Sequence, residues 1–145
     1  GYSPLVDRLI FGLYNQKFAP TRTDLDWLSA DEANVDRYIA DPLCGEKPSV
    51  NLFREMMGGL RRILRPENLD KMDKDMPVLF IAGQDDPVGQ MGEGVKKAGE
   101  SFRRAGVKDV TVKLYPGLRH EILNEACHEI VYQDILNWIQ SRLPR

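Results

Sequence analysis

The stretches MPVLFIAGQDDPVG (residues 76–89) and DVTVKLYPGLRHEILNE (residues 109–125) decide the fold of this chain. The first contains an unbroken apolar run from Pro77 to Ala82, and the second contains Val110 to Tyr115, which is rich in β-branched residues. An apolar run without alternation predicts a strand covered on both faces, as in a parallel sheet. The roughly 20 residues between the runs have a helical pattern, which supplies the crossover that parallel strands need. The sequence therefore predicts an α/β fold built on a βαβ unit.

Titratable side chains follow both predicted strands. Asp85 and Asp86 come directly after the first strand, and His120 lies just beyond the Pro-Gly turn that ends the second. Because parallel strands end at the same edge of a sheet, a carboxylate and the imidazole can meet there. A carboxylate that holds a histidine fixes its tautomer and stabilises the imidazolium, as general-base catalysis requires. An Asp before Pro is also common in purely structural turns, so spacing alone leaves that role open.

Further helices are predicted from apolar residues at helical spacing, over residues 4–14, 31–39, 49–64 and about 125–142, and around Met91, Val95, Ala98 and Phe102. The helix over 49–64 contains Gly58-Gly59, which would each cost about 1 kcal/mol there. Close approach of another backbone, or a kink, would explain them. Its Met-rich stripe fits either an acyl pocket or core packing. Residues 65–75 are predicted to be a polar linker.

Composition excludes several classes of function. The net charge is -2, with both signs interspersed, so there is no basic surface for nucleic acid. No apolar run approaches the ~18 residues of a transmembrane segment. No signal peptide is visible. We expect a cytoplasmic protein, because both cysteines are expected to be free thiols. Cys44 and Cys127 form no C-x-x-C pair, so we expect free thiols, no metal site and no cofactor.

Several segments resemble one enzyme family. IAGQDDPVG (81–89), KLYPGLRHEILNE (113–125) and DILNWI (134–139) are similar to the C-terminal part of bacterial α/β-hydrolases of the serine aminopeptidase S33 or lysophospholipase group, which is monoacylglycerol-lipase-like. TRTDLDWLS (21–29) and YIADPLCG (38–45) resemble the cap that covers the active site in that group. The resemblance implies a partial α/β-hydrolase fold. A helical cap over 1–70 would precede a βαβ-α unit with parallel strands over 71–145.

The resemblance also assigns catalytic roles. The family pattern G-x-x-D-P selects Asp86 as the triad acid over Asp85, which is expected to cap or face solvent, and G-x-R-H-E selects His120 as the base. In this fold the nucleophile precedes the acid and the histidine. No G-x-S-x-G occurs in the chain, and its five serines lie outside such a motif. The implied enzyme is a serine carboxylester hydrolase that cleaves an acylglycerol or lysophospholipid, with a peptide-like amide as the alternative. Its nucleophile would lie on the absent N-terminal half, so this chain alone is expected to be inactive.

Two other interpretations stay open. A strand from Pro77 to Ala82 with a bare hydrophobic edge would be a template for pairing, which suits a non-catalytic binding or self-association module. A split enzyme, completed by a separate polypeptide that carries the Ser, is the other. The expected partners are therefore an acyl-ester lipid or similar small molecule, the N-terminal half of the same protein, and a second copy.

Four more side chains are candidates for supporting roles. Arg119 and Glu121 flank His120 and are expected to brace its loop by charge pairing. Trp27 and Tyr38 fit either a substrate contact or the core of a small cap.

Overall fold

A two-stranded parallel sheet lies at the centre of the computed structural model, which describes residues 1–5 and 11–143. Strand β1 (Val78–Gly83) pairs with β2 (Val110–Tyr115), in a register that runs from Val78 opposite Val110 to Gly83 opposite Tyr115. Both predicted strands and their parallel direction are confirmed. Because the register is unshifted, the two strands end side by side.

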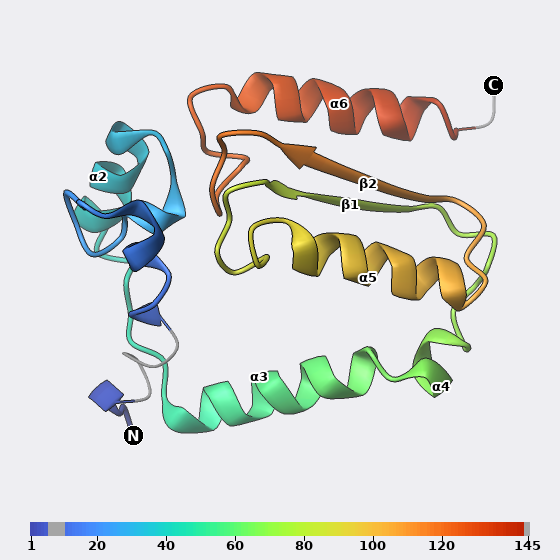
Figure 1. Ribbon diagram of the computed structural model, residues 1–145, viewed down its shortest axis with the longest axis horizontal. Helices are drawn as coiled ribbons and strands as arrows, with labels where there is room; N and C mark the ends of the chain where they lie inside the picture. The colour runs from blue at the N-terminus through green and yellow to red at the C-terminus, as the bar shows by residue number, and fades with distance from the viewer. Residues whose placement is uncertain (6–10, 144–145) are drawn as a thin grey trace.

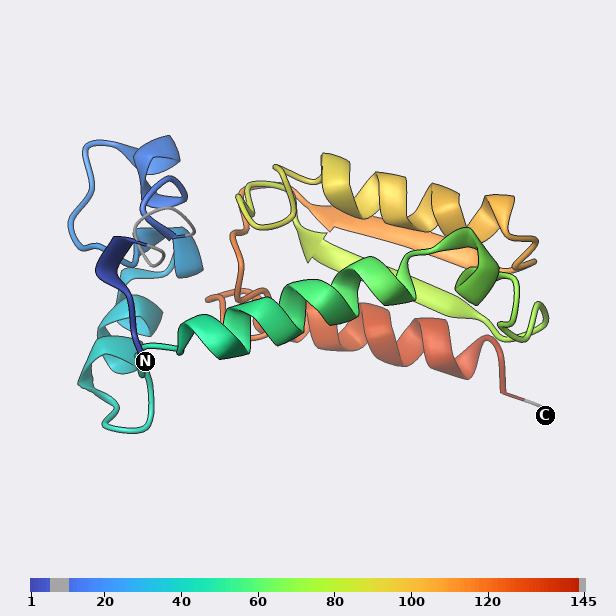
Figure 2. The same ribbon diagram turned by 90° about the horizontal axis from the view of Figure 1, so that it is seen from below.

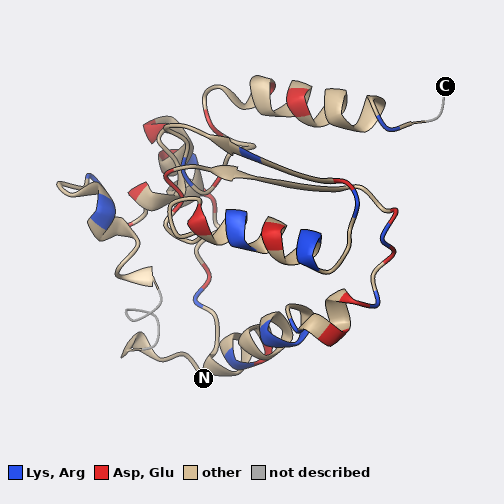
Figure 3. Cartoon of the chain, turned by 45° about the vertical axis from the view of Figure 1, so that its right-hand side comes forward, with Lys and Arg blue, Asp and Glu red and all other residues tan. Residues whose placement is uncertain are grey.

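Two helices cover opposite faces of the sheet (Figure 1). Helix α5 (Glu93–Arg104) is the crossover between the strands, and α6 (His128–Gln140) follows β2. On the α5 face, a Cβ at Gly99 would run into the side chain of Val112, so this helix packs very closely on β2. Acidic and basic residues alternate along α5 (Figure 3), as expected for the exposed side of a surface helix.

The face of the sheet that α6 covers carries the main hydrophobic cluster. Its buried members are Tyr115, Ile122 and Val131, with Ile81, Leu118 and Ile135 packed against them. The predicted start of α6 at Glu125 is wrong by three residues. The Glu125 side chain is buried against residues 29–31 instead, and the helix begins at His128 after a series of turns.

A small lobe stands beyond the C-terminal ends of both strands (Figure 1). It contains the 3-10 helices η1 (Asn15–Phe18) and η2 (Asp26–Leu28) and the helix α2 (Glu32–Ala40). We call residues 11–41 the N-terminal lobe. Asp31 caps α2, because its side chain accepts from the backbone N–H of Ala33, so the helix predicted over 31–39 is confirmed. Of the helix predicted over 4–14, the middle part, residues 6–10, lies outside the described residues.

Helix α3 (Val50–Ile63) leaves the lobe and runs back along the length of the strands (Figure 2). Ser49 caps it through the backbone N–H of Leu52, as the predicted helix over 49–64 requires. The helix is continuous through Gly58-Gly59, and no described atom lies within 4 Å of a Cβ at either glycine. Close approach of a backbone therefore does not explain them.

Much of the apolar stripe of α3 is exposed. Its exposed apolar residues are Val50, Leu52, Met56, Met57, Leu60 and Ile63. Next comes α4 (Pro66–Leu69), a single turn inside the stretch predicted to be a linker. Among the described residues, no helix is long and apolar enough to cross a membrane.

Candidate active site

Asp86 lies in the turn that follows β1. Its backbone N–H donates to the carbonyl of Gly83, and its Oδ1 accepts from the backbone N–H of Val88 at 2.8 Å. This side-chain turn orients the carboxylate, which is only 9% exposed. The second oxygen, Oδ2, is thereby left to face the loop that follows β2.

His120 lies in that loop, residues 116–127, which we call the His120 loop. The imidazole Nδ1 is 3.1 Å from Oδ2 of Asp86. The strand pairing explains the contact, because Gly83 and Tyr115 end their strands as neighbours. The structure therefore brings together the two residues that the sequence singled out, and leaves Asp85 outside this contact.

The contact fixes the state of the imidazole. A carboxylate can only accept a hydrogen bond, so Nδ1 carries the proton and Nε2 keeps its lone pair when the ring is neutral. The hydrogen bond that Nδ1 donates to Asp86 raises the pKa of His120 above its ordinary value, while burial of the ring lowers it. The charges of Asp86 and Glu121 act in the same direction as the hydrogen bond. The ring is 40% exposed, so a reactant can reach it.

Aromatic residues of the N-terminal lobe cover the site. The Trp27 ring lies 5.2 Å from the His120 ring, centroid to centroid, and Tyr14 lies 5.3 Å from Trp27. Burial raises the pKa of the Tyr14 hydroxyl, and the nearby charge of Asp86 raises it further. Trp27 therefore packs on the site itself rather than only in the interior of the lobe.

The backbone of the His120 loop is held between β1 and the lobe. On the strand side, the N–H of Asp85 donates to the carbonyl of Leu118 at 3.0 Å. A Cβ at Gly83 would overlap the carbonyls of Leu118 and Arg119, so only glycine allows this crossing. The Gly of the motif G-x-x-D-P thus makes room for the segment that leads to His120.

On the lobe side, Arg119 and Glu121 both bind the lobe. The Arg119 guanidinium donates to the carbonyls of Asp26 and Ser29, and the backbone N–H of Glu121 donates to the carbonyl of Leu28 at 2.8 Å. Their expected charge pairing is wrong, since no ion pair joins them in the described part of the chain. They brace the loop through hydrogen bonds to the lobe instead.

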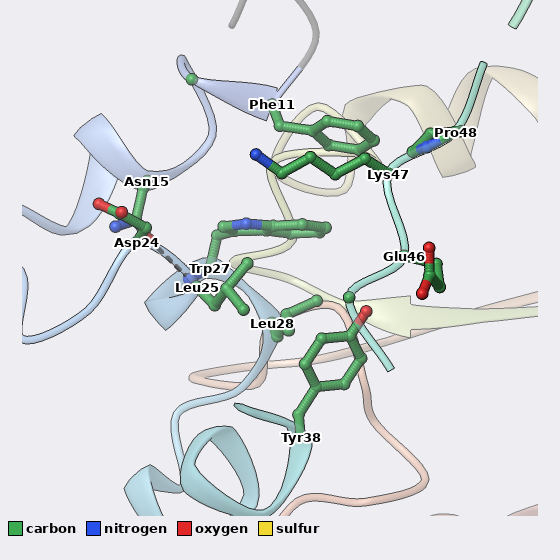
Figure 4. Close-up of a pocket in the computed structure, with 12 residues that line it drawn as sticks. Phe11, Asn15, Asp24, Leu25, Trp27, Leu28, Tyr38, Glu46, Lys47 and Pro48 are labelled. Atoms are coloured by element: carbon green, nitrogen blue, oxygen red, sulfur yellow. Dashed lines mark hydrogen bonds between the residues drawn. The ribbon is translucent and has the colours of Figure 1, made fainter. Parts of the chain in front are cut away.

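A cavity of about 540 Å³ opens between the N-terminal lobe and residues 45–48 (Figure 4). Trp27 forms its centre, Phe11 lies on one side of the indole and Leu28 and Tyr38 on the other. Polar side chains also line it, among them Asp24, Glu46 and Lys47. Because Trp27 contacts both this cavity and the His120 ring, the cavity wall and the site share one side chain.

The family described as Serine aminopeptidase, S33 matches residues 3–127. The chain belongs to this S33 family. It is 31% identical over 124 residues to a monoacylglycerol lipase of Mycolicibacterium smegmatis, covering 83% of this chain and 40% of that protein. It is 28% identical over 140 residues to a monoglyceride lipase of Saccharomyces cerevisiae, covering 86% of this chain and 42% of that protein.

Solved structures give the same family fold. A thermostable carboxyl esterase from Bacillus coagulans superposes with a TM-score of 0.88 and 28% sequence identity, over 97% of this chain and 46% of that one. The S33 chain thus has part of an α/β-hydrolase fold and spans less than half the length of these relatives. The division into residues 1–70 and 71–145 stays a prediction.

Four of the five serines of this S33 chain make hydrogen bonds within the structure. Ser29 donates to Glu125, and Ser49 caps α3. Ser101 and Ser141 donate to backbone carbonyls of their own helices. These hydroxyls are therefore engaged away from Nε2 of His120.

Glu125 is the residue of this region that the sequence did not identify. It is 2% exposed and accepts hydrogen bonds from the N-terminal lobe and from the His120 loop. The sequence pattern N-E before an apolar stretch is typical of a helix start. It therefore predicted a helix start at Glu125 rather than a buried carboxylate that binds the lobe. The only available signal was its place inside the family-like segment KLYPGLRHEILNE.

Proposed function

We propose that this chain carries the acid and the base of a serine carboxylester hydrolase, with Asp86 as the acid and His120 as the base. The observation that carries the proposal is the 3.1 Å contact between Asp86 Oδ2 and His120 Nδ1, at the edge where both strands end. This contact leaves Nε2 as the acceptor that a general base needs. The family membership of the chain and its lipase and esterase relatives support the same activity.

In the proposed reaction, Nε2 of His120 takes the proton of a serine hydroxyl as the serine oxygen attacks the ester carbonyl. Asp86 stabilises the imidazolium that forms. His120 then gives the proton to the leaving alcohol, and in the second half it activates water in the same way. The chain contains no G-x-S-x-G motif, so the serine and the oxyanion donors are supplied by another half of the hydrolase domain. The isolated chain is then inactive.

The substrate that we propose is an acyl ester, a monoacylglycerol or lysophospholipid. The apolar cavity beside Trp27 has room for part of an acyl chain, and its polar side chains suit a headgroup. The names of the relatives point to glycerol esters and carboxyl esters. We also propose a cytoplasmic setting, consistent with free Cys44 and Cys127.

The test is turnover of p-nitrophenyl esters by the whole hydrolase domain that contains this chain. His120→Ala and Asp86→Asn should each lower kcat by about 10³- to 10⁴-fold, because base and tautomer control are lost. Asp85→Asn and His128→Gln are matched controls, since neither side chain contacts the pair. Full activity in His120→Ala, or turnover by the isolated chain that His120→Ala abolishes, would overturn the assignment.

A second candidate function is a self-association module, which the exposed apolar surface favours. Apolar side chains of α3 such as Met56, Leu60 and Ile63 are 43 to 58% exposed, and the sheet has two strands in the described part of the chain. Exposed patches and open strand edges both promote association. We expect dimers or larger species of the isolated chain by light scattering at micromolar concentration. A monomeric mass would exclude this candidate.

A further inference from the structure

The Glu125 carboxylate connects the His120 loop to the N-terminal lobe. Its Oε2 accepts from the Ser29 hydroxyl at 2.8 Å and from the backbone N–H of Asp31 at 3.1 Å. Its Oε1 accepts from the backbone N–H of Ala30 at 3.0 Å and from that of Arg119 at 3.1 Å. At 2% exposure, the group has replaced water with these four donors. We call these five residues the Glu125 cluster.

The cluster acts on the residue next to the base. Arg119 directly precedes His120, and its N–H is the one donor that comes from the His120 loop. The other three donors come from residues 29–31, just before α2. We propose that Glu125 is a positioning residue, which fixes the His120 loop to the N-terminal lobe and thereby sets the place of His120 beside Asp86. This positioning role rests on the proposed function of His120 as the base, whereas the contacts of Glu125 are independent of that function.

The side chains of Arg119 and Glu121, on either side of His120, also bind the N-terminal lobe. The Arg119 guanidinium donates to the carbonyls of Asp26 and Ser29, and its carbon lies 3.9 Å from the centre of the Phe18 ring. The Glu121 carboxylate accepts from the side-chain amide of Asn34 at 2.9 Å. The residues on both sides of His120 are thus held by the lobe, and only His120 turns its side chain to Asp86. A shift of the lobe would carry the imidazole with it.

The chemistry of the donors makes a carboxylate necessary. Three of the four donors are backbone N–H groups, which cannot reverse their direction. Glu125→Gln keeps the size of the side chain but places an amide NH₂ against N–H donors. With the NH₂ at the Oε1 position, the N–H groups of Ala30 and Arg119 lose their acceptor; at the Oε2 position, the N–H of Asp31 keeps only the Ser29 hydroxyl oxygen at 3.1 Å. In either orientation a backbone N–H loses a carboxylate oxygen and faces an NH₂ group, which weakens the attachment. We expect the His120 loop to move away from its place in this variant.

The test reads His120 directly, by NMR titration of its ring in the isolated chain, without substrate. In Glu125→Gln we expect the pKa of His120 to decrease by at least half as much as it decreases in Asp86→Asn, because the hydrogen bond to Asp86 weakens. Hydrogen exchange of the Arg119 amide should speed up about tenfold, as the loss of one hydrogen bond implies. Glu129→Gln is the matched control, since Glu129 is an exposed acid four residues on. It should change neither quantity.

An unchanged His120 pKa in folded Glu125→Gln would overturn the proposal and leave Glu125 with a purely structural role. If Glu125→Gln does not fold, Ser29→Ala decides, because it removes one donor and keeps the carboxylate. It should lower the His120 pKa in the same direction, by less; no change would equally overturn the proposal. Failure of the proposed function is a separate result, namely no ester turnover by the whole domain while these shifts occur.

Discussion

At the scale of single residues, Asp86 has the largest effect on the pKa of His120, and the charge of Glu121 adds to it. The hydrogen bond that the ring donates to Asp86 raises the pKa of His120 above the ordinary value of 6.5, and this effect is larger than the opposite effect of burial. A raised pKa means that the folded chain binds the proton more tightly than the unfolded chain. This stabilisation is complete below about pH 6.5 and is lost as pH rises through the raised pKa.

The first prediction concerns this pH dependence. Asp86→Asn should lower the pKa of His120 and flatten the fall in the free energy of unfolding above about pH 6.5. Urea unfolding at a series of pH values, with NMR titration of the ring, measures both. Asp85→Asn removes the adjacent carboxylate, which is not among the causes of the shift, so it should leave the pKa of His120 in place. Equal shifts in the two variants would show that charge, not contact, controls the histidine.

The second prediction concerns Gly83. An added methyl group would overlap the carbonyls of Leu118 and Arg119, which are backbone atoms that cannot turn aside. Gly83→Ala should therefore lower the free energy of unfolding by about 1–3 kcal/mol, as overpacking does. It should also change the chemical shifts of His120, because the displaced backbone leads to that residue. Wild-type stability and unchanged shifts would mean that the crossing is looser than the structure shows.

At the scale of elements, α3 provides the matching glycine test. Gly58 lies inside the helix, and no described atom is within 4 Å of a Cβ placed there. Gly58→Ala should raise the free energy of unfolding by about 0.5–1 kcal/mol, because alanine loses less backbone entropy in a helix. Thermal and urea unfolding measure it. A loss of stability would indicate that a partner, such as a second copy, packs on the helix at this point.

At the scale of the whole molecule, the N-terminal lobe and the strand ends form two sides of one site, and the chain spans less than half the length of its relatives. We predict that mixing this chain with the N-terminal half of a family member, which carries the serine, produces esterase activity. The gain should be absent with His120→Ala and retained with His128→Gln. Self-association of this chain should decrease as the halves combine, because the N-terminal half then competes with a second copy for the exposed apolar surface. Association without any gain would favour the binding module.

Much of the fold could be predicted from sequence because its signals are local. The apolar run over β1 and the β-branched run over β2 are each typical of a buried strand, and the crossover between them makes the pairing parallel. Ser49 and Asp31 are N-caps that can be recognised from residue type and position. The contact between Asp86 and His120 follows from parallel pairing plus the family-like motifs around them.

Other parts of the site could not be predicted in this way. Helix α6 begins three residues later than its pattern suggests, because Glu125 is drawn into the N-terminal lobe. Arg119 and Glu121 were expected to pair with one another, yet each finds a partner in the lobe. A helix-start pattern and a pair of opposite charges describe local tendencies, and tertiary contacts overrode both.

The sequence by itself determined the two parallel strands, the helices that cover them, and the acid and imidazole that meet where the strands end. These follow from periodicity, turn chemistry and motif spacing, all of which act over a few residues. Only the tertiary structure decided that Trp27 lies against His120 and that Ser29 bonds to Glu125, 96 residues further along the chain. Contacts at that separation have no local pattern, because they depend on how the lobe closes over the strand ends.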